Sequence, residues 1–300
     1  MSTAGTENHN LESPRRAGEM LEWLPAIVGL AVLYVPTFVD LSRTMWPVED
    51  YSHGPIILAV VVWLFWQTRD RWLTVPAVPA PKTGWPVLVF GLLFYVLGRS
   101  QDVIMFEVGS MIPVLAGTML LMRGWPAIRV VWFALLFVIF MVPLPGVILD
   151  AMTAPLKKNV STIAEMILYA AGYPIARSGV TLTIGQYQLL VADACSGLNS
   201  MFSLTALGLL YLYIMQHAAK WRNALMMLSI LPIAFTANII RVMILVLVTY
   251  HFGDEAGQGF VHGFAGMILF TVALIILFSF DGLLGIFDRR PSPRSGSSRP

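Results

Sequence analysis

Long apolar stretches, separated by short polar or Pro/Gly-containing segments, dominate the chain from residue 23 onward. A helix needs about 20 mostly apolar residues to cross the hydrocarbon core of a membrane. Eight stretches approach this length, and they run over residues 23–40, 52–68, 84–99, 103–122, 126–145, 196–216, 223–249 and 260–280. The pattern therefore predicts an all-α polytopic membrane protein with about eight transmembrane helices.

The longest stretch outside these predicted spans, about residues 146–195, has patterns of its own. Apolar positions recur at helical spacing over residues 147–171, which is typical of an amphipathic helix lying on a membrane surface. Residues 180–191 contain two short apolar runs around Gly185 and Gln186, a pattern that predicts a β-hairpin. We therefore expect a surface helix and a hairpin directly before the sixth span.

Basic residues are distributed unequally between the two sides of the predicted helices. With the N-terminus in the cytoplasm, thirteen of the 19 Lys and Arg residues fall on the cytoplasmic side and five on the outer side, while Arg241 lies within the seventh span. Cytoplasmic loops carry the excess of Lys and Arg in membrane proteins, so the pattern favours this orientation. It places both termini inside and residues 146–195 outside, and it predicts a multi-pass protein of a cytoplasmic (inner) membrane.

Composition supports this class and excludes others. Hydrophobic residues make up 57% of the chain and charged residues only 12%, which lies outside the usual range of soluble domains. The net charge of +2 comes from scattered Lys and Arg residues, a distribution that does not favour nucleic-acid binding. No His or acidic residues have metal-ligand spacing, so we expect no metal and no cofactor.

The organisation along the chain is predicted to be simple. Residues 1–22 are polar and lack a cleavable signal peptide, so we expect a disordered cytoplasmic N-terminus. Residues 23–285 form the predicted transmembrane domain, and residues 286–300 a basic, disordered cytoplasmic tail.

Three chemically reactive side chains are predicted to converge near the outer face. Cys195, the single cysteine, precedes the sixth span, and His262 opens the eighth span, which is also entered from outside. Arg241 lies about 12 to 14 Å below the outer end of the seventh span, from where a long side chain can reach upward. The predicted topology thus brings a thiol, a guanidinium and an imidazole to one extracytoplasmic site.

These groups are sufficient for acyl transfer. The positive end of the following helix and the charge of Arg241 both favour the thiolate of Cys195. His262 is a candidate to protonate a leaving amine and then to deprotonate a second nucleophile. Backbone N–H groups near Ser196 and Gly197, together with Arg241, are candidates to stabilise a tetrahedral oxyanion.

Each residue also has a purely structural interpretation. A lone cysteine such as Cys195 is often inert packing, and His262 at a helix start suits a membrane interface. A charge inside a span costs about 2.5 to 3.5 kcal/mol, so Arg241 needs a polar site or a counter-charge such as Glu107 of the fourth span.

Two supporting residues have open roles. Asp193 either orients His262 or, lying close to Cys195, disfavours the thiolate. His53 stands at the outer start of the second span, where it either borders the same site or lies at the membrane interface.

The residues around these positions resemble the Cys, Arg and His boxes of the exosortase/archaeosortase family. The matching segments are residues 191–200 (Val-Ala-Asp-Ala-Cys-Ser-Gly-Leu-Asn-Ser), 238–241 (Asn-Ile-Ile-Arg), 262–266, 50–54 and 143–145, within a resemblance covering about residues 25–285. The resemblance implies Cys195 as nucleophile, Arg241 as transition-state partner and His262 as acid/base, with Asn238 a candidate supporting residue.

This family resemblance implies a sortase-like transpeptidase on the outer side of the bacterial cytoplasmic membrane. Its expected substrates are exported proteins with a C-terminal Pro-containing motif of the PEP-CTERM kind, a membrane span and a basic tail, which pass through a thioacyl intermediate to an acceptor nucleophile. Two alternatives stay open. One is a hydrolytic intramembrane cysteine protease, and the other is a non-catalytic transporter or exopolysaccharide export subunit, for which ionisable residues deep in several spans are expected.

Overall fold

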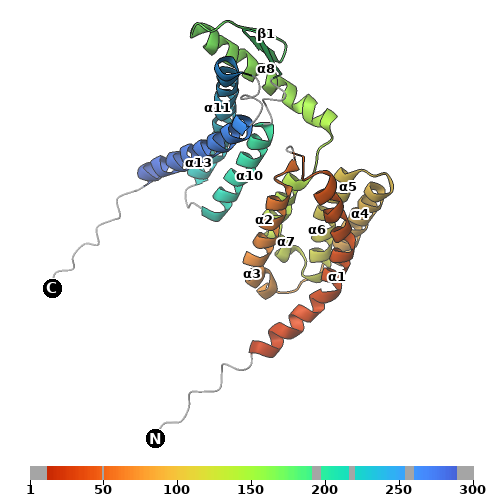
Figure 1. Ribbon diagram of the computed structural model, residues 1–300. Coiled ribbons are helices and arrows are strands. Elements are labelled where there is room, and N and C mark those ends of the chain that lie inside the picture. The colour runs from red at the N-terminus through yellow and green to blue at the C-terminus, as the bar shows by residue number, and fades with distance from the viewer. Residues whose placement is uncertain (1–11, 49–50, 191–196, 216–219, 254–259, 289–300) are drawn as a thin grey trace, which may run out of the picture. The chain divides into compact units, whose positions relative to one another are not determined.

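The chain divides into two compact units, Met1–Pro143 and Leu144–Pro300, in the computed structural model. The structure describes residues 12–48, 51–190, 197–215, 220–253 and 260–288 (Figure 1). The sequence predicted one domain over residues 23–285. The division falls within Pro143-Leu144-Pro145, where the two prolines cannot continue the hydrogen bonding of a preceding helix.

The first unit is built from helices and contains no strand among its described residues. These helices are α1 (Glu12–Thr44), α2 (Gly54–Gln67), α3 (Arg69–Thr74), α4 (Pro81–Ser100), α5 (Ile104–Gly109), α6 (Met111–Met122), α7 (Trp125–Phe137) and the 3-10 helix η2 (Val138–Met141). Because α1 begins at Glu12, residues 12–22 are helical, whereas the sequence predicted disorder for them.

Close packing of α4 against α6 depends on glycine. A Cβ added at Gly91 would lie 2.7 Å from Cγ2 of Val114, and one added at Gly117 would lie 2.6 Å from the backbone nitrogen of Leu88. Small residues let two helix backbones approach each other closely, which is how helices pack tightly inside a membrane.

A buried carboxylate joins three helices of the first unit. Glu107 of α5 is 3% exposed, and its Oε2 accepts a hydrogen bond from Thr37 Oγ1 of α1 at 2.9 Å. Arg99 of α4 donates through Nη1 to the same oxygen at 3.4 Å and to Asp40 Oδ2 at 2.6 Å. A buried charge is tolerated when it is paired and hydrogen-bonded, so this cluster fixes α1, α4 and α5 together.

The second unit combines helices with a small sheet. Its elements are α8 (Gly146–Ala170), β1 (Ile175–Ser178), β2 (Thr181–Ile184), β3 (Tyr187–Leu190), α10 (Gly197–Met215), α11 (Lys220–Phe252) and α13 (Phe260–Asp288). Both the predicted helix over residues 147–171 and the predicted hairpin are confirmed as secondary structure. The position of α8 on a membrane surface stays a prediction.

The sheet has the order β1-β2-β3, with both pairs antiparallel. Gly185 has φ +57°, and Gln186 is not among the residues with positive φ, as expected of a two-residue type II′ hairpin turn. The side chains of Leu182 and Ile184 are fully buried between α8 and α11. Their partners are Val160, Ala164 and Leu168 of α8 and Val242, Leu245 and Val246 of α11. The sheet is therefore fixed on the C-terminal half of α11.

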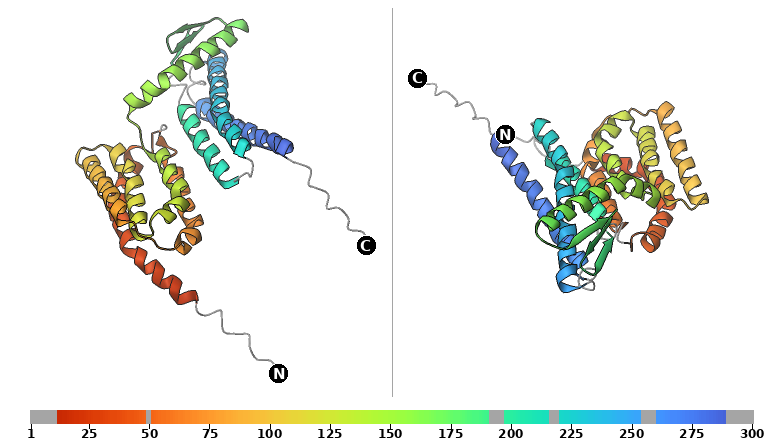
Figure 2. Two further views of the ribbon diagram at one scale, coloured as in Figure 1. Left: turned by 180° about the vertical axis from the view of Figure 1, so that it is seen from behind. Right: turned by 90° about the horizontal axis from the view of Figure 1, so that it is seen from above.

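Helix α11 packs against both α10 and α13, and the three helices lie side by side in both views of the second unit (Figures 1 and 2). One buried cluster joins Leu204, Ala234 and Ala273, one residue from each helix. A second cluster joins Met226 and Ile230 of α11 to Leu277 and Leu284 of α13. These contacts align the three helices along their length.

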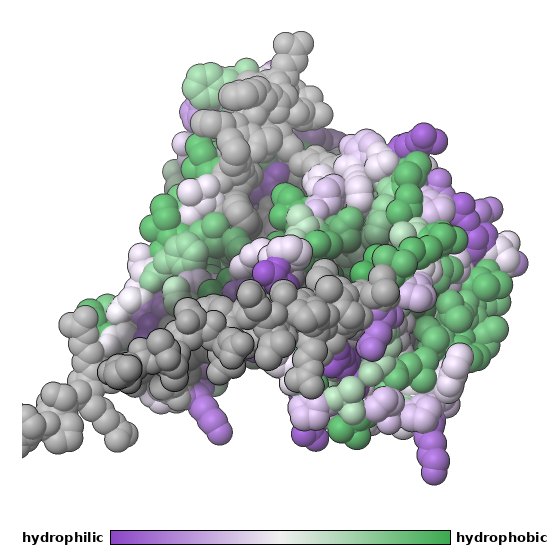
Figure 3. Space-filling model, turned by 90° about the horizontal axis from the view of Figure 1, so that it is seen from below, coloured by the Kyte–Doolittle hydropathy of each residue, from purple (hydrophilic) through white to green (hydrophobic). Residues whose placement is uncertain are grey.

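Four described helices are long and apolar enough to cross a membrane, and they comprise Glu22–Thr44, Pro81–Ser100, Ile104–Met122 and Lys220–Phe252. Four shorter apolar helices accompany them, at Gly54–Gln67, Trp125–Met141, Phe202–Met215 and Thr271–Ile286. Each of the eight overlaps one predicted stretch. Hydrophobic side chains cover much of the described surface seen in Figure 3, as expected where lipid replaces water as the solvent.

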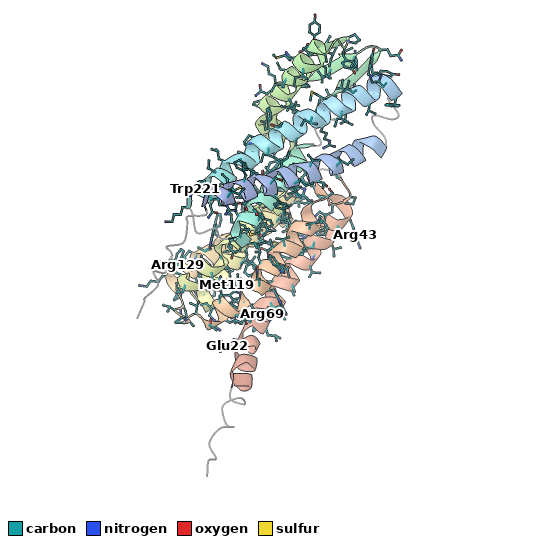
Figure 4. The ribbon with its side chains drawn as sticks, turned by 90° about the vertical axis from the view of Figure 1, so that its left-hand side faces the viewer. Glu22, Arg43, Arg69, Met119, Arg129 and Trp221 are labelled. Atoms are coloured by element: carbon teal, nitrogen blue, oxygen red, sulfur yellow. The ribbon has the colours of Figure 1, made fainter. Side chains whose placement is uncertain are left out.

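Basic residues of the first unit separate along α1 (Figure 4). Arg43 lies at the C-terminal end of α1, whereas Arg69 and Arg129 lie toward the end marked by Glu22. Arg99, through its ion pair with Asp40, belongs to the Arg43 end. Which of these ends faces the cytoplasm stays a prediction.

Candidate functional site

The packing of α10, α11 and α13 determines which helix ends lie together. Tyr211, Met226 and Leu284 belong to one of the two clusters, and Leu204, Ala234 and Ala273 belong to the other. From the first cluster to the second, the residue numbers fall along α10 and α13 and rise along α11. α11 therefore runs antiparallel to both neighbours. The first turns of α10 and α13 consequently lie toward the C-terminal end of α11.

Arg241 lies in this part of α11. Leu204 and Ala234 are in the same cluster, and seven residues separate Leu204 from Gly197 and Ala234 from Arg241. At 1.5 Å rise per residue, both Gly197 and Arg241 are about 10 Å from the shared cluster and in the same direction. The backbone of Arg241 is thus level with the first residue of α10.

The environment of Arg241 is buried. Its side chain is 4% exposed, and Asn238, one turn earlier on α11, is 6% exposed. Val242, the next residue, and Leu245, one turn later, belong to the core under the sheet. Arg241 is therefore enclosed within the second unit, and its part in a catalytic site stays a prediction.

The predicted partners of Arg241 are described only in part. Cys195, Asp193 and Ser196 lie outside the described residues. Gly197 begins α10, and His262 lies in the first turn of α13 with its backbone described and its side chain not. The backbone shows how the three helices are arranged. The convergence of the three catalytic side chains at their shared end stays a prediction.

The alternative counter-charge for Arg241 has other partners. Glu107 belongs to the first unit, where its carboxylate pairs with Arg99 and accepts the Thr37 hydroxyl. This arrangement supplies the positive charge that Glu107 needs. The ion pair between Glu107 and Arg241 stays a prediction, because it would join the two units.

His53, the other histidine proposed to border the site, immediately precedes α2 in the first unit. Gly54 and Pro55 start that helix directly after it.

Among the residues that the structure describes, no group of three or more His, Cys, Asp or Glu side chains is arranged to hold a metal ion.

An apolar cavity of about 240 Å³ opens between α11 and α13. Its lining includes Thr236, Ala237 and Ile240 of α11 and Val272 and Ala273 of α13. None of its lining side chains is ionisable, so it suits hydrocarbon and offers no group for acid/base or nucleophilic chemistry.

The opposite end of the three helices holds a polar cluster that the sequence did not reveal. Arg222 of α11 donates through Nε to Asp281 Oδ1 at 2.8 Å and through Nη2 to the Asp281 backbone oxygen at 2.9 Å. Tyr211 of α10 donates to Asp281 Oδ2 at 2.6 Å. One carboxylate thus joins all three helices at the end away from Arg241.

These features define a helical, multi-pass membrane protein with a buried arginine beside the starts of two helices. A sequence model of the family described as transmembrane exosortase (Exosortase_EpsH) matches residues 45–279. The chain therefore belongs to the transmembrane exosortase family, whose members are sorting transpeptidases. The matched range includes Cys195, Arg241 and His262. Neither the curated proteins nor the solved structures contain a match to this chain.

Proposed function

We propose that this exosortase-family protein is a cysteine-dependent transpeptidase with eight membrane spans and an extracytoplasmic site in the bacterial inner membrane. The eight spans are the four long and four shorter apolar helices. The excess of Lys and Arg on the predicted inner side supports the orientation. Cys195 is the nucleophile, His262 the acid/base and Arg241 the transition-state partner.

The alignment of α10, α11 and α13 is the observation that carries this proposal. Arg241 is level with Gly197. Cys195 precedes Gly197 by two residues, so chain connectivity keeps their Cα atoms within about 7 Å of each other. His262 lies in the first turn of α13, which runs parallel to α10 and begins toward the same end. Three residues far apart in sequence therefore belong to one end of one helix group, which supports a shared site.

The reaction follows from these three groups. The Cys195 thiolate attacks the scissile carbonyl carbon, and Arg241 stabilises the resulting oxyanion. The C–N bond breaks, His262 donates a proton to the leaving amine, and the substrate becomes a thioester on Cys195. An acceptor amine then loses its proton to His262 and attacks the thioester, which forms a new amide and releases the thiolate.

Family membership supports the substrate class. Exosortases are paired with PEP-CTERM proteins. We infer that this enzyme acts on exported proteins whose C-terminus carries a Pro-containing motif, a membrane span and a basic tail. The predicted position of Cys195 before the sixth span, on the outer side, suits a motif that stands just above such a span.

The test uses a reporter protein that carries a C-terminal sorting signal encoded in the same genome. Cells expressing the wild-type enzyme should process the reporter, and Cys195→Ala should abolish processing, because removal of a catalytic nucleophile costs about 10⁴- to 10⁶-fold in rate. Cys195→Ser keeps the size of the side chain and should also be inactive, since a hydroxyl in place of a thiol is a far weaker nucleophile. Processing that survives Cys195→Ala would refute the proposal.

Mass spectrometry of the new C-terminus separates transfer from hydrolysis. An added amine-linked group identifies a transpeptidase. A free carboxylate would instead identify a hydrolytic cysteine protease that uses the same thioester. Thiol labelling of Cys195 in intact cells by a membrane-impermeant reagent tests the orientation, and labelling only after lysis would contradict it.

A further inference from the structure

The two edges of the sheet differ in how their backbone groups are used. In an antiparallel pair, hydrogen-bonded and non-hydrogen-bonded residue pairs alternate. The two-residue turn at Gly185 and Gln186 makes Ile184 and Tyr187 a hydrogen-bonded pair, so Leu182 and Leu189 form the next one. The N–H and C=O groups of Gln188 and Leu190 therefore point away from β2, toward the outer edge of β3.

The edge formed by β1 is occupied by its own neighbours. The Ile175 N–H donates to the Tyr173 oxygen at 2.9 Å. The Arg177 side chain donates to Glu165 Oε2 of α8 at 2.9 Å and to the Gly179 oxygen at 2.9 Å. A charged, anchored side chain is one of the features that keep another strand from pairing with an edge.

The edge formed by β3 has none of these features. Tyr187–Leu190 contains no charged residue and no proline, and its pairing with β2 is continuous. Gln188 is exposed and Leu190 is 41% exposed. Among the described residues, no hydrogen bond uses the outward backbone groups of Gln188 and Leu190.

The outer edge of β3 lies close to the proposed nucleophile along the chain. β3 is packed at the C-terminal end of α11, where Gly185 contacts Tyr250 and Tyr187 approaches Gly253. Its last residue, Leu190, precedes Cys195 by five residues. Chain connectivity keeps the Cα of Cys195 within about 18 Å of the Cα of Leu190, a distance that about five extended residues of a bound peptide can span.

We propose that the outer edge of β3 binds the sorting motif of the substrate as an added strand. This inference rests on the proposed function, because it names how the same site recognises its substrate. The occupant is the extended segment on the N-terminal side of the scissile bond, and it runs parallel to β3, since both chains continue from the outer face into the membrane. Main-chain hydrogen bonds to Gln188 and Leu190 supply the recognition.

A motif that contains proline is compatible with binding as an added strand. Proline has no N–H, so on a strand it is tolerated only where that group would point away from the ladder. Residues two apart on a strand point to the same side. The prolines of the motif therefore occupy the positions whose N–H groups face away from β3, and the intervening residues make the hydrogen bonds.

The first test removes one outward N–H from the enzyme. Gln188→Pro keeps the hydrogen bonds of Tyr187 and Leu189 to β2 but removes the Gln188 donor, and it should raise KM for a reporter peptide about tenfold with little change in kcat. Gln188→Ala is the matched comparison, because it removes the side chain and keeps the N–H, and its KM should lie well below that of Gln188→Pro. A KM for Gln188→Pro equal to that of Gln188→Ala would overturn the inference.

The second test leaves the enzyme unchanged and so does not depend on whether a variant folds. The probe is a labelled synthetic peptide that carries the Pro-containing motif of a sorting signal from the same genome, with one backbone amide N-methylated at a time. Its Kd is measured on full-length Cys195→Ala in lipid nanodiscs. Binding should weaken about tenfold at every second residue of the peptide, in the register that leaves the prolines between the sensitive positions, and stay unchanged at the other non-proline positions. A uniform loss, or none, would overturn strand addition.

The two proposals fail in different ways. Processing of the reporter that persists in Cys195→Ala refutes the transpeptidase mechanism, whatever the peptide series shows. Cys195-dependent processing combined with a Kd that shows no period of two refutes strand addition and leaves the mechanism standing. A period of two in the Kd series supports strand addition even before turnover is measured.

Discussion

Helix α11 carries two arginines with different surroundings, the partly buried Arg222 near its N-terminus and the buried Arg241 in its C-terminal half. At the N-terminal end, Arg222 is matched by Asp281 of α13, whose second carboxylate oxygen accepts the Tyr211 hydroxyl of α10. At the other end, Arg241 is level with Gly197, where the chain arrives from Cys195. A carboxylate joins the helices at the Arg222 end, and the first turns of α10 and α13 lie toward the Arg241 end.

This difference separates a structural use of charge from a chemical one. Breaking a buried ion pair costs several kcal/mol because the remaining charge is left without compensation, so the Arg222 end contributes mainly to stability. A cation beside a nucleophile contributes when negative charge develops on a carbonyl oxygen, so the Arg241 end is expected to contribute mainly to rate. Substitutions at the two ends should therefore affect different measurements.

The largest effect is expected for Arg241. Arg241→Gln should lower reporter processing about 10³-fold, because the donor that stabilises the oxyanion loses its charge. Arg241→Lys should recover only part of the rate, since an ammonium lacks the planar fork of the guanidinium. Initial rates of reporter processing in nanodiscs measure this. Arg222→Gln is the matched control on the same helix, and its rate per folded molecule should remain close to that of the wild type.

An equal loss of rate for Arg241→Gln and Arg222→Gln would contradict the comparison. It would mean that both arginines act through the stability of the helix group. A circular dichroism spectrum and a thermal melt of each variant distinguish an unfolded protein from a folded, inactive one.

Much of this architecture could be predicted from the sequence because lipid imposes strong constraints. Each of the eight apolar stretches overlaps an apolar helix, since a chain in hydrocarbon must satisfy its backbone groups within the helix. The hairpin was predicted from the glycine between two apolar runs, and Gly185 has the positive φ that such a turn requires. β1 was missed, because a four-residue strand that follows Pro174 and contains Arg177 has the pattern of a loop.

The polar contacts were less predictable. Arg222 and Asp281 each lie one residue outside the predicted spans 223–249 and 260–280, where a charge is usually solvated. Only the packing of α11 against α13 brings them together. The same holds for Glu107, whose partners Thr37 and Arg99 come from two other helices. Sequence alone shows that a buried charge needs a partner but does not identify the partner.

A smaller effect, on stability, is expected at Asp281. Asp281→Asn keeps the shape of the side chain but leaves Arg222 without its counter-charge, and it should lower the free energy of unfolding by about 3 kcal/mol. Denaturant titration in mixed detergent micelles measures this change. The double variant Arg222→Met with Asp281→Leu should recover most of the loss, because it removes both charges together. A double variant less stable than Asp281→Asn would show that the pair itself, rather than the uncompensated charge, determines stability.

The smallest effect is expected at Tyr211, and it tests whether the carboxylate depends on its third partner. Tyr211→Phe removes only the hydroxyl that donates to Asp281 Oδ2 at 2.6 Å, while Arg222 still pairs with the other oxygen. Hydrogen bonds between helices in membranes contribute about 1 kcal/mol, so the free energy of unfolding should fall by about that amount. Tyr169→Phe, on the exposed surface of α8, is the control and should change nothing. A loss for Tyr211→Phe as large as that for Asp281→Asn would mean that the hydroxyl, and not the ion pair, joins the three helices at this end.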